Sequence, residues 1–314
     1  MCTSITLKSN DNNYLLARTM DFSFDLDPVM TLFPRNLEIE FKEASLKKHY
    51  AFFGLAKDVW SYYLADGLNE YGLTVAALYF EGYAKYKDEA DKDTVGIASY
   101  ELVMWLLAKC KTVEEVIEEF NNITVINEVM GFLGVIPPLH WIVSDKDGNS
   151  LIIEIINEEL SFHKNSIGLL TNSPDYNWHL TNVRSYIGLD PKQVSSRTLY
   201  GVDFKPFGQG SGTFGLPGDF TPPSRFIRTL YSKLSSNTAE NSDELVLYAM
   251  HILNGVDIVK GNVVTPRATI DYTQYTSYML NNDLKYYFRL HNSLNVIEYN
   301  LNDYNLDDNV VKNI

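Results

Sequence analysis

The chain has 314 residues and a formal net charge of −14, and 45 % of its residues are apolar, which is typical of a globular protein with a sizeable core. The negative charge argues against nucleic-acid partners, which are bound by clustered Lys and Arg, and it disfavours adhesion to anionic membranes. No apolar run is long enough to span a bilayer and no signal peptide is visible, so we expect a cytoplasmic protein.

The chain begins with a predicted β-hairpin. Residues 2–7 and 14–20 are strand-like and are separated by a polar turn cluster. A symmetric turn pairs the start of the first strand with the end of the second, so Arg18 and Asp21 come within a residue or two of Cys2. A register slip of one residue would reverse the face of each side chain. The sequence therefore predicts proximity and leaves the orientation open.

The remaining elements follow in blocks. Further strands are predicted at residues 73–79, 141–144, 151–155, 275–280, 285–290 and 295–301. Helices are predicted at residues 99–111, 113–120, 222–231 and 241–253, the second of them opened by a capping box of Thr112 and Glu115. Because strands do not alternate regularly with helices, the pattern favours antiparallel sheets layered with helices over a doubly wound parallel sheet. With no repeat and no clear linker, we expect a single domain over residues 1–314.

Several familiar motifs are absent or incomplete. The glycines of residues 210–215 match the spacing of a dinucleotide fingerprint, but Pro217 follows where a helix should begin, so we interpret the stretch as a turn or pocket loop. No G-x-S-x-G elbow is present. No histidine spacing matches a metal motif; the histidines are His49, His140, His163, His179, His251 and His291. We expect no metal and no cofactor. Cys110 lies in a helical segment and is interpreted as a buried apolar residue.

Cys2 directly follows Met1. A small second residue permits removal of Met1, which would leave a cysteine that carries both a thiol and a free α-amine. These two groups are a nucleophile and a base on one residue, as in N-terminal nucleophile catalysis. Taken alone, a cysteine at this position more often has no catalytic role. A catalytic interpretation of Cys2 therefore depends on the residues around it.

Five segments of the chain resemble the choloylglycine hydrolase family, which contains bile salt hydrolases and penicillin V acylases. The segments are MCTS at residues 1–4, ARTMD at 17–21, ADGLNE at 65–70, LTNSP at 170–174 and GLPGDFTPPSRF at 215–226. They follow the family order and spacing along essentially the whole chain. The resemblance implies an α+β fold, the four-layer αββα sandwich of N-terminal nucleophile hydrolases with antiparallel sheets. It also implies hydrolysis of a small acyl amide without a cofactor, and a homotetramer.

The resemblance assigns three residues to the nucleophile. Cys2 would attack once Met1 is lost, and Arg18 would lie beside the thiol, where a positive charge favours the thiolate. Asp21 would receive the α-amine, which an acceptor-only carboxylate can orient. Taken separately, Arg18 and Asp21 could equally be an ordinary exposed ion pair at the end of a hairpin.

Three further residues would stabilise the reaction. The side-chain N–H of Asn172 and the backbone N–H of Tyr79 would bind the tetrahedral oxyanion, where one donor contributes about 2.7–4 kcal/mol. Arg225 would support the site electrostatically. The alternatives without a catalytic role are that Asn172 starts a turn and that Arg225 faces solvent in the first turn of a helix.

Tyr79 also bears on the substrate. Bile salt hydrolases usually have asparagine where this chain has Tyr79, whereas penicillin V acylases commonly have tyrosine. An aromatic pocket for a phenoxyacetyl group could be lined by Phe22, Phe24, Trp60, Tyr62, Tyr63 and Tyr79. We therefore expect cleavage of penicillin V or a related acyl amide through a thioester. The alternative substrates are conjugated bile salts and N-acyl homoserine lactones. The alternative to an enzyme is a non-catalytic binding protein that keeps the pocket.

Overall fold

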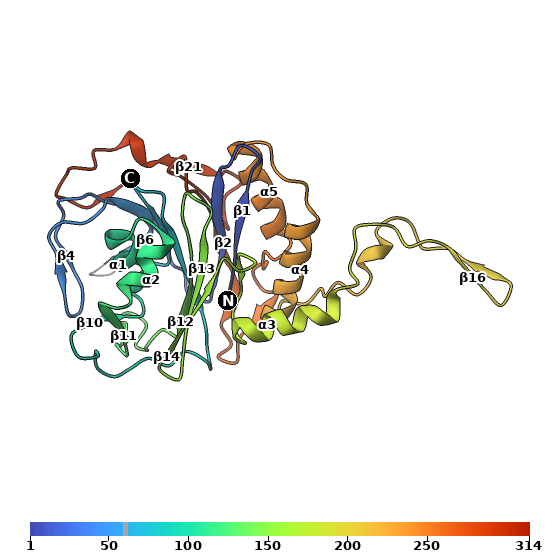
Figure 1. Ribbon diagram of the computed structural model, residues 1–314, viewed down its shortest axis with the longest axis horizontal. Coiled ribbons are helices and arrows are strands. Elements are labelled where there is room, and N and C mark those ends of the chain that lie inside the picture. Colours follow the sequence, from blue (N-terminus) through green and yellow to red (C-terminus); the bar gives the residue numbers. More distant parts are fainter. Residues whose placement is uncertain (59–61) are drawn as a thin grey trace.

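Two large antiparallel sheets lie face to face at the centre of the molecule, and helices cover the outer face of each (Figure 1). The computed structural model describes residues 1–58 and 62–314. The layers therefore run helix, sheet, sheet, helix. This confirms the α+β fold and the αββα sandwich that the resemblance implied.

The first sheet contains the N-terminal hairpin and has the strand order β15-β1-β2-β19-β20-β21, with β18 paired to β19. Its strands are β1 (Cys2–Lys8), β2 (Tyr14–Phe22), β15 (Leu169–Leu170), β18 (Val263–Val264), β19 (Ile270–Leu280), β20 (Lys285–Leu290) and β21 (Ile297–Asn300). The hairpin register pairs Cys2 with Met20, as a symmetric turn predicts. The pairing of Ser4 with Leu170 places the segment that follows β15 beside the start of the chain.

The second sheet has the order β14-β13-β12-β9-β8-β6-β3-β22, with β7 paired to β6. Its strands are β3 (Val29–Phe33), β6 (Phe52–Asp58), β7 (Tyr62–Leu64), β8 (Asp66–Asn69), β9 (Thr74–Tyr79), β12 (Leu139–Ser144), β13 (Ser150–Ile156), β14 (Glu159–Lys164) and β22 (Lys312–Asn313). Three small two-stranded pairs accompany the sheets; they consist of β4 (Ile39–Glu40) with β5 (Ser45–Leu46), β10 (Val95–Ala98) with β11 (Ile123–Ile126), and β16 (Arg197–Leu199) with β17 (Val202–Phe204).

Five α-helices form the outer layers of the described structure. Helices α1 (Leu102–Lys109) and α2 (Val113–Glu119) lie over the second sheet, and α3 (Tyr176–Val183), α4 (Pro222–Ser235) and α5 (Ser242–Asn254) lie over the first (Figure 1). One of the two hydrogen bonds of the predicted capping box at α2 is present: the Thr112 side chain accepts from the Glu115 backbone N–H. Short 3₁₀ turns span Arg184–Tyr186, Ser211–Thr213 and Leu301–Asp303.

Strand alternation divides the apolar residues between two cores. Along β9, Val75 and Ala77 belong to the cluster under α1 and α2, whereas Ala76 and Leu78 belong to the cluster that extends to the first sheet and its helices. Both faces of the inner strands are thus buried. Cys110 is 1 % exposed within the first of these clusters, as the sequence predicted.

A long arm, residues 187–215, projects from the body beyond α3 and has the β16–β17 hairpin at its tip (Figure 1). Neither the arm nor helix α3 was predicted from the sequence. The glycine stretch 210–215 lies on this arm, where Gly210 has φ 87° and precedes a 3₁₀ turn, so the stretch forms a turn. Throughout the described ranges, no helix combines the length and the apolar character that crossing a bilayer requires.

Candidate active site

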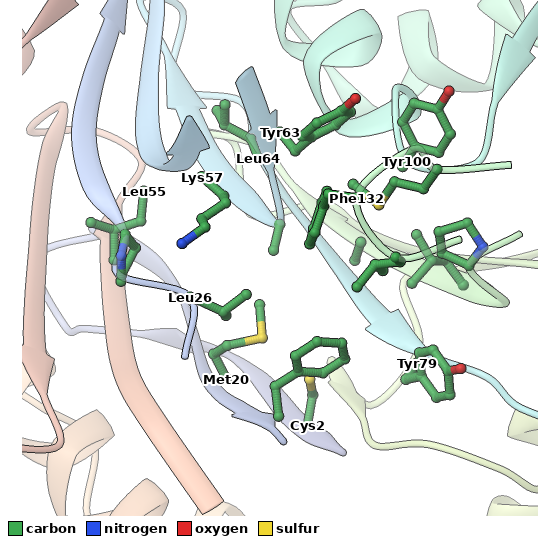
Figure 2. Close-up of a pocket in the computed structure, with 18 of the residues that line it drawn as sticks. Cys2, Met20, Leu26, Leu55, Lys57, Tyr63, Leu64, Tyr79, Tyr100 and Phe132 are labelled. Carbon is green, nitrogen blue, oxygen red and sulfur yellow. The ribbon is translucent and has the colours of Figure 1, made fainter. Parts of the chain in front are cut away.

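Cys2 lies at one end of a largely apolar pocket between the two sheets. It begins β1 and is 4 % exposed. In Figure 2, Cys2, Met20 and Tyr79 lie at one end of the pocket, and Tyr63 and Tyr100 lie at the opposite end. A molecule bound in the pocket would therefore meet Cys2 at this end.

The Arg18 guanidinium contacts the sulfur directly. Its Nη2 donates to Cys2 Sγ at 2.8 Å, and its Nη1 donates to Asp66 Oδ2 at 3.1 Å. Both Arg18 and Asp66 are fully buried. Burial alone would lower the pKa of Arg18, but the charges of Cys2, Tyr275 and Asp66 more than offset it and raise the pKa above its ordinary value. A permanent positive charge is thus held against the thiol.

The Arg18 guanidinium also donates to the Thr19 and Ala65 carbonyls, and its charged partner is the Asp66 carboxylate. Besides Arg18, it accepts hydrogen bonds from the hydroxyls of Tyr275 at 2.8 Å, Ser277 at 3.4 Å and Tyr286. Burial beside this carboxylate raises the pKa of Tyr275 and Tyr286 well above the ordinary tyrosine value, so both hydroxyls remain donors. Asp66 lies in the ADGLNE segment but was not among the site residues predicted from the sequence. The available signal in the sequence was a carboxylate within a segment that resembles the family.

The Asn172 side chain forms hydrogen bonds with Cys2, Arg225 and Tyr79. Its Oδ1 accepts from the Cys2 backbone N–H at 2.8 Å and from Arg225 Nη2 at 2.6 Å, and its Nδ2 donates to the Tyr79 carbonyl at 2.7 Å. Arg225 Nη1 also donates to the Cys2 carbonyl at 2.5 Å and to Thr3 Oγ1 at 2.6 Å. The structure therefore brings Cys2, Tyr79, Asn172 and Arg225 into one buried network.

Tyr79 contributes its backbone as well as its ring. Successive residues of a strand direct their N–H groups to opposite edges. The Ala77 N–H donates to Ala65 and the Phe80 N–H donates to Pro138, so the Tyr79 N–H points to the Ala77 edge, beyond the end of β8. The Tyr79 carbonyl on this edge accepts from Asn172. The ring lines the pocket, and burial raises its pKa.

Asp21 lies near this network but has a different set of partners. Its carboxylate accepts from Thr273 Oγ1 at 2.6 Å and from Thr19 Oγ1 at 3.3 Å, and Arg225 Nη1 lies 3.9 Å away. Burial raises its pKa against the opposing effect of the nearby positive charges. With Met1 attached, the Met1 ammonium donates to the Asp21 backbone carbonyl at 2.6 Å. Contact between the Asp21 carboxylate and a free Cys2 amine stays a prediction.

The aromatic pocket was predicted only in part. Phe22, Tyr63 and Tyr79 line it, whereas Tyr62 packs edge-on against Phe33 and Phe24 is 49 % exposed. Trp60 lies outside the described residues. The other lining residues, which sequence reasoning missed, include Met20, Leu26, Pro28, Leu55, Lys57, Leu64, Tyr100, Met130, Phe132, Leu133, Pro137, Leu139 and Tyr275. They come from segments far apart in the chain, and no local pattern marks them.

The polar groups gathered around Cys2 are a guanidinium and amides. No group of three or more His, Cys, Asp or Glu side chains that could hold a metal ion occurs within residues 1–58 and 62–314. The chemistry available is a thiol next to a guanidinium, with amide donors from Asn172 and Tyr79 close by. Fold and site together define an N-terminal nucleophile hydrolase class.

Comparison with known proteins places the chain within this class. Residues 2–313 match the linear amide C–N hydrolases of the choloylglycine hydrolase family. The protein belongs to this family and is a hydrolase of linear amide C–N bonds, so the binding-protein alternative is set aside.

Individual relatives support the assignment. A bile salt hydrolase/transferase of Clostridium perfringens is 35 % identical over 317 residues, covering 99 % of this chain and 96 % of the relative. The crystal structure of the C2A variant of the conjugated bile acid hydrolase from Clostridium perfringens superposes with a TM-score of 0.93 at 33 % identity, covering 100 % and 96 %. The structure of penicillin V acylase from Agrobacterium tumefaciens has a TM-score of 0.80 at 22 % identity, covering 99 % and 90 %. This last likeness shows the fold alone.

Proposed function

We propose that the protein is a conjugated bile salt hydrolase whose nucleophile is Cys2. The observation that carries this proposal is the similarity to a bile salt hydrolase at 35 % identity over nearly the full length of both chains. From the sequence, Tyr79 favours penicillin V as the substrate. The likeness to a penicillin V acylase, at 22 % identity, shows the fold alone, so we place the bile salts above penicillin V. Among the described residues, none that lines the pocket specifically favours N-acyl homoserine lactones.

The proposed reaction begins after Met1 is removed. The Cys2 sulfur attacks the amide carbonyl carbon, and the free α-amine of Cys2 takes the thiol proton, directly or through water, and later gives it to the departing amine. The C–N bond then breaks and leaves a thioester on the sulfur. Attack by water on the thioester releases the acid and restores the thiol.

Two donors would stabilise the tetrahedral intermediate. Asn172 Nδ2 carries two hydrogens, one of which is directed at the Tyr79 carbonyl. The second hydrogen and the Tyr79 backbone N–H are the proposed oxyanion donors. Arg18 would stabilise the attacking sulfur as a thiolate, Asp21 would orient the α-amine, and Arg225 would hold Asn172 in place.

The pocket supports an apolar acyl group. Its wall combines aliphatic, thioether and aromatic side chains, and Lys57 is the one charged residue among those that line it in the described structure. A steroid acid could lie against this wall with its amide at Cys2. The amino-acid part of the substrate would then be the leaving group.

We further propose that the chain works as a single domain in a homo-oligomer, a tetramer by analogy with the family. The arm supports association, because Tyr200, Phe207 and Phe214 on it are almost fully exposed. The cytoplasmic location expected from the sequence stays a prediction.

Comparison of substrates tests the proposal. Hydrolysis of glyco- and tauro-conjugated bile acids is measured beside hydrolysis of penicillin V, with Cys2→Ala as the inactive reference. We expect a clear preference for the bile acids and no turnover of any substrate by Cys2→Ala. A preference for penicillin V would overturn the proposed substrate, and turnover by Cys2→Ala would exclude the cysteine mechanism.

A further inference from the structure

Two buried histidines contact the backbone on both sides of the Asn172 α-carbon. His140 Nε2 lies 3.0 Å from the Thr171 carbonyl oxygen, and His179 Nε2 lies 2.8 Å from the Asn172 carbonyl oxygen. Each histidine is 1 % exposed. Since a carbonyl only accepts hydrogen bonds, both Nε2 atoms must carry a proton for these contacts to form. Two consecutive carbonyls are thus held from two directions.

The histidines come from different layers of the fold. His140 lies on β12 in the second sheet, and its ring stacks on Phe80 at 4.2 Å between centroids. His179 lies on α3 over the first sheet and stacks on Phe226 at 4.7 Å. Phe80 follows Tyr79 in the chain and Phe226 follows Arg225. The rings therefore pack against the neighbours of two residues that contact the Asn172 side chain.

The second nitrogen of His140 faces a carboxylate. His140 Nδ1 is 3.1 Å from Glu154 Oε1, and the two Glu154 oxygens also accept the Tyr176 backbone N–H at 3.1 and 3.2 Å. Each His140 nitrogen thus faces an acceptor oxygen, Nε2 the Thr171 carbonyl and Nδ1 the Glu154 carboxylate. Burial opposes the charge on Glu154, but hydrogen bonds from His140 and His163 lower its pKa to about 2. A charge-assisted contact therefore anchors the His140 ring.

The second nitrogen of His179 has no such anchor. His179 Nδ1 is a buried nitrogen without a hydrogen-bond partner in the described structure. Burial lowers the pKa of His179, which agrees with a neutral ring that donates through Nε2 alone. Its polar role is thus confined to the Asn172 carbonyl and, at 3.4 Å, to the Thr171 hydroxyl.

We propose that His140 and His179 are positioning residues that clamp the backbone on both sides of the Asn172 α-carbon, through the Thr171 and Asn172 carbonyls, and so fix where the Asn172 side-chain amide points. This inference rests on the proposed role of Asn172 as an oxyanion donor. A misplacement of about 1 Å can cost about 100-fold in rate. Loss of the clamp should therefore lower kcat and leave substrate binding in the pocket largely unchanged.

His179 allows the sharper test because its other nitrogen has no partner. His179→Phe keeps a ring against Phe226 and removes the donor, whereas His179→Gln keeps an N–H near the position of Nε2. We expect kcat on a conjugated bile acid to fall about 10- to 100-fold in His179→Phe, with KM within about twofold. We expect kcat in His179→Gln within about threefold of the parent protein. His49→Phe is the matched control, since His49 is also buried and holds the Tyr50 and Leu37 carbonyls at 2.7 and 3.0 Å.

A double-variant comparison separates positioning from a general structural effect. If His179 acts through Asn172, adding His179→Phe to Asn172→Ala should change kcat by no more than about twofold. Losses that multiply would overturn the proposal, as would parent-like kcat in His179→Phe. If His179→Phe does not fold, His179→Asn replaces it, because the shorter asparagine amide reaches only the position of Nδ1. A kcat of His179→Asn equal to that of His179→Gln would then overturn the proposal.

Cys2→Ala, assayed in the same series, distinguishes the two possible failures. Turnover by Cys2→Ala would remove the proposed function and this inference with it. An inactive Cys2→Ala beside a fully active His179→Phe would remove the clamp alone.

Discussion

Arg18 Nη2 lies 2.8 Å from Cys2 Sγ, while Nη1 of the same guanidinium lies 3.1 Å from Asp66 Oδ2. The hairpin register creates this contact, since Ser4 pairs with Arg18 and Cys2 with Met20. The guanidinium thus connects the Cys2 sulfur to a carboxylate that three hydroxyls also contact. One of these hydroxyls belongs to Tyr275, which also lines the pocket.

Replacing Asp66 should destabilise the protein severely. Asp66→Asn leaves the Arg18 charge buried without its counter-ion, and breaking such a pair typically costs about 3–5 kcal/mol. The free energy of unfolding, measured by urea denaturation, should fall by this amount. Asp307→Asn is the control, because the Arg35–Asp307 pair is exposed and should contribute about 1 kcal/mol or less. Equal effects of the two variants would contradict the role assigned to Asp66.

Tyr79 should govern selectivity more than rate. Its backbone contacts Asn172 whichever side chain is present, whereas its ring lines the pocket. Tyr79→Asn should therefore keep kcat on bile acids within a few-fold of the parent value. The kcat/KM for bile acids, divided by that for penicillin V, should shift by about 10-fold, as expected when one pocket contact changes. Steady-state kinetics on both substrates measure this ratio. An unchanged ratio would mean that the ring does not contact the acyl group.

Glu154 should make the protein sensitive to acid. Its pKa is lowered from an ordinary value of 4.5 to about 2 in the folded protein. A lowered pKa means that the charged form stabilises the fold above about pH 4.5 and that this contribution disappears as the pH falls toward 2. Glu154→Gln should be less stable at pH 6 and should show a flatter decline of unfolding free energy between pH 4.5 and 2. The exposed Glu159→Gln should leave both quantities unchanged; a parent-like decline in Glu154→Gln would contradict the assignment.

The exposed arm should drive association. Phe207 and Phe214 are 101 % and 95 % exposed on the arm, so burial against another copy would stabilise an assembly. Replacing both with Ser should lower the mass measured by light scattering, relative to the parent protein at the same concentration. Leu294→Ser is the control, because Leu294 is 101 % exposed but lies outside the arm. A parent protein that is monomeric at micromolar concentration would rule out this role.

The elements nearest the start of the chain were the most predictable from the sequence. A symmetric turn sets the register of a short hairpin locally, which is why the approach of Arg18 to Cys2 could be predicted. The match of several ordered segments to a known family then implied the sandwich, which no local pattern could have shown. Helix α3 was missed because its apolar residues are few, with only Tyr176 and His179 buried.

The supporting residues of the site were not predictable in the same way. Asp66 and Tyr286 are 220 residues apart and meet only because two strands in different sheets face each other. His140 and His179 match no metal spacing and carry no local signal, yet both contact the carbonyls beside Asn172. Their contacts depend on the packing of whole layers, which sequence spacing does not describe.

The mechanism depends on a free amine at Cys2, and one measurement tests this directly. The chain is prepared with a removable N-terminal extension, and turnover of a conjugated bile acid is measured before and after cleavage that leaves Cys2 first, with intact mass confirming each form. We predict no turnover before cleavage and full turnover after it. Equal turnover by the extended and the cleaved forms would contradict the account.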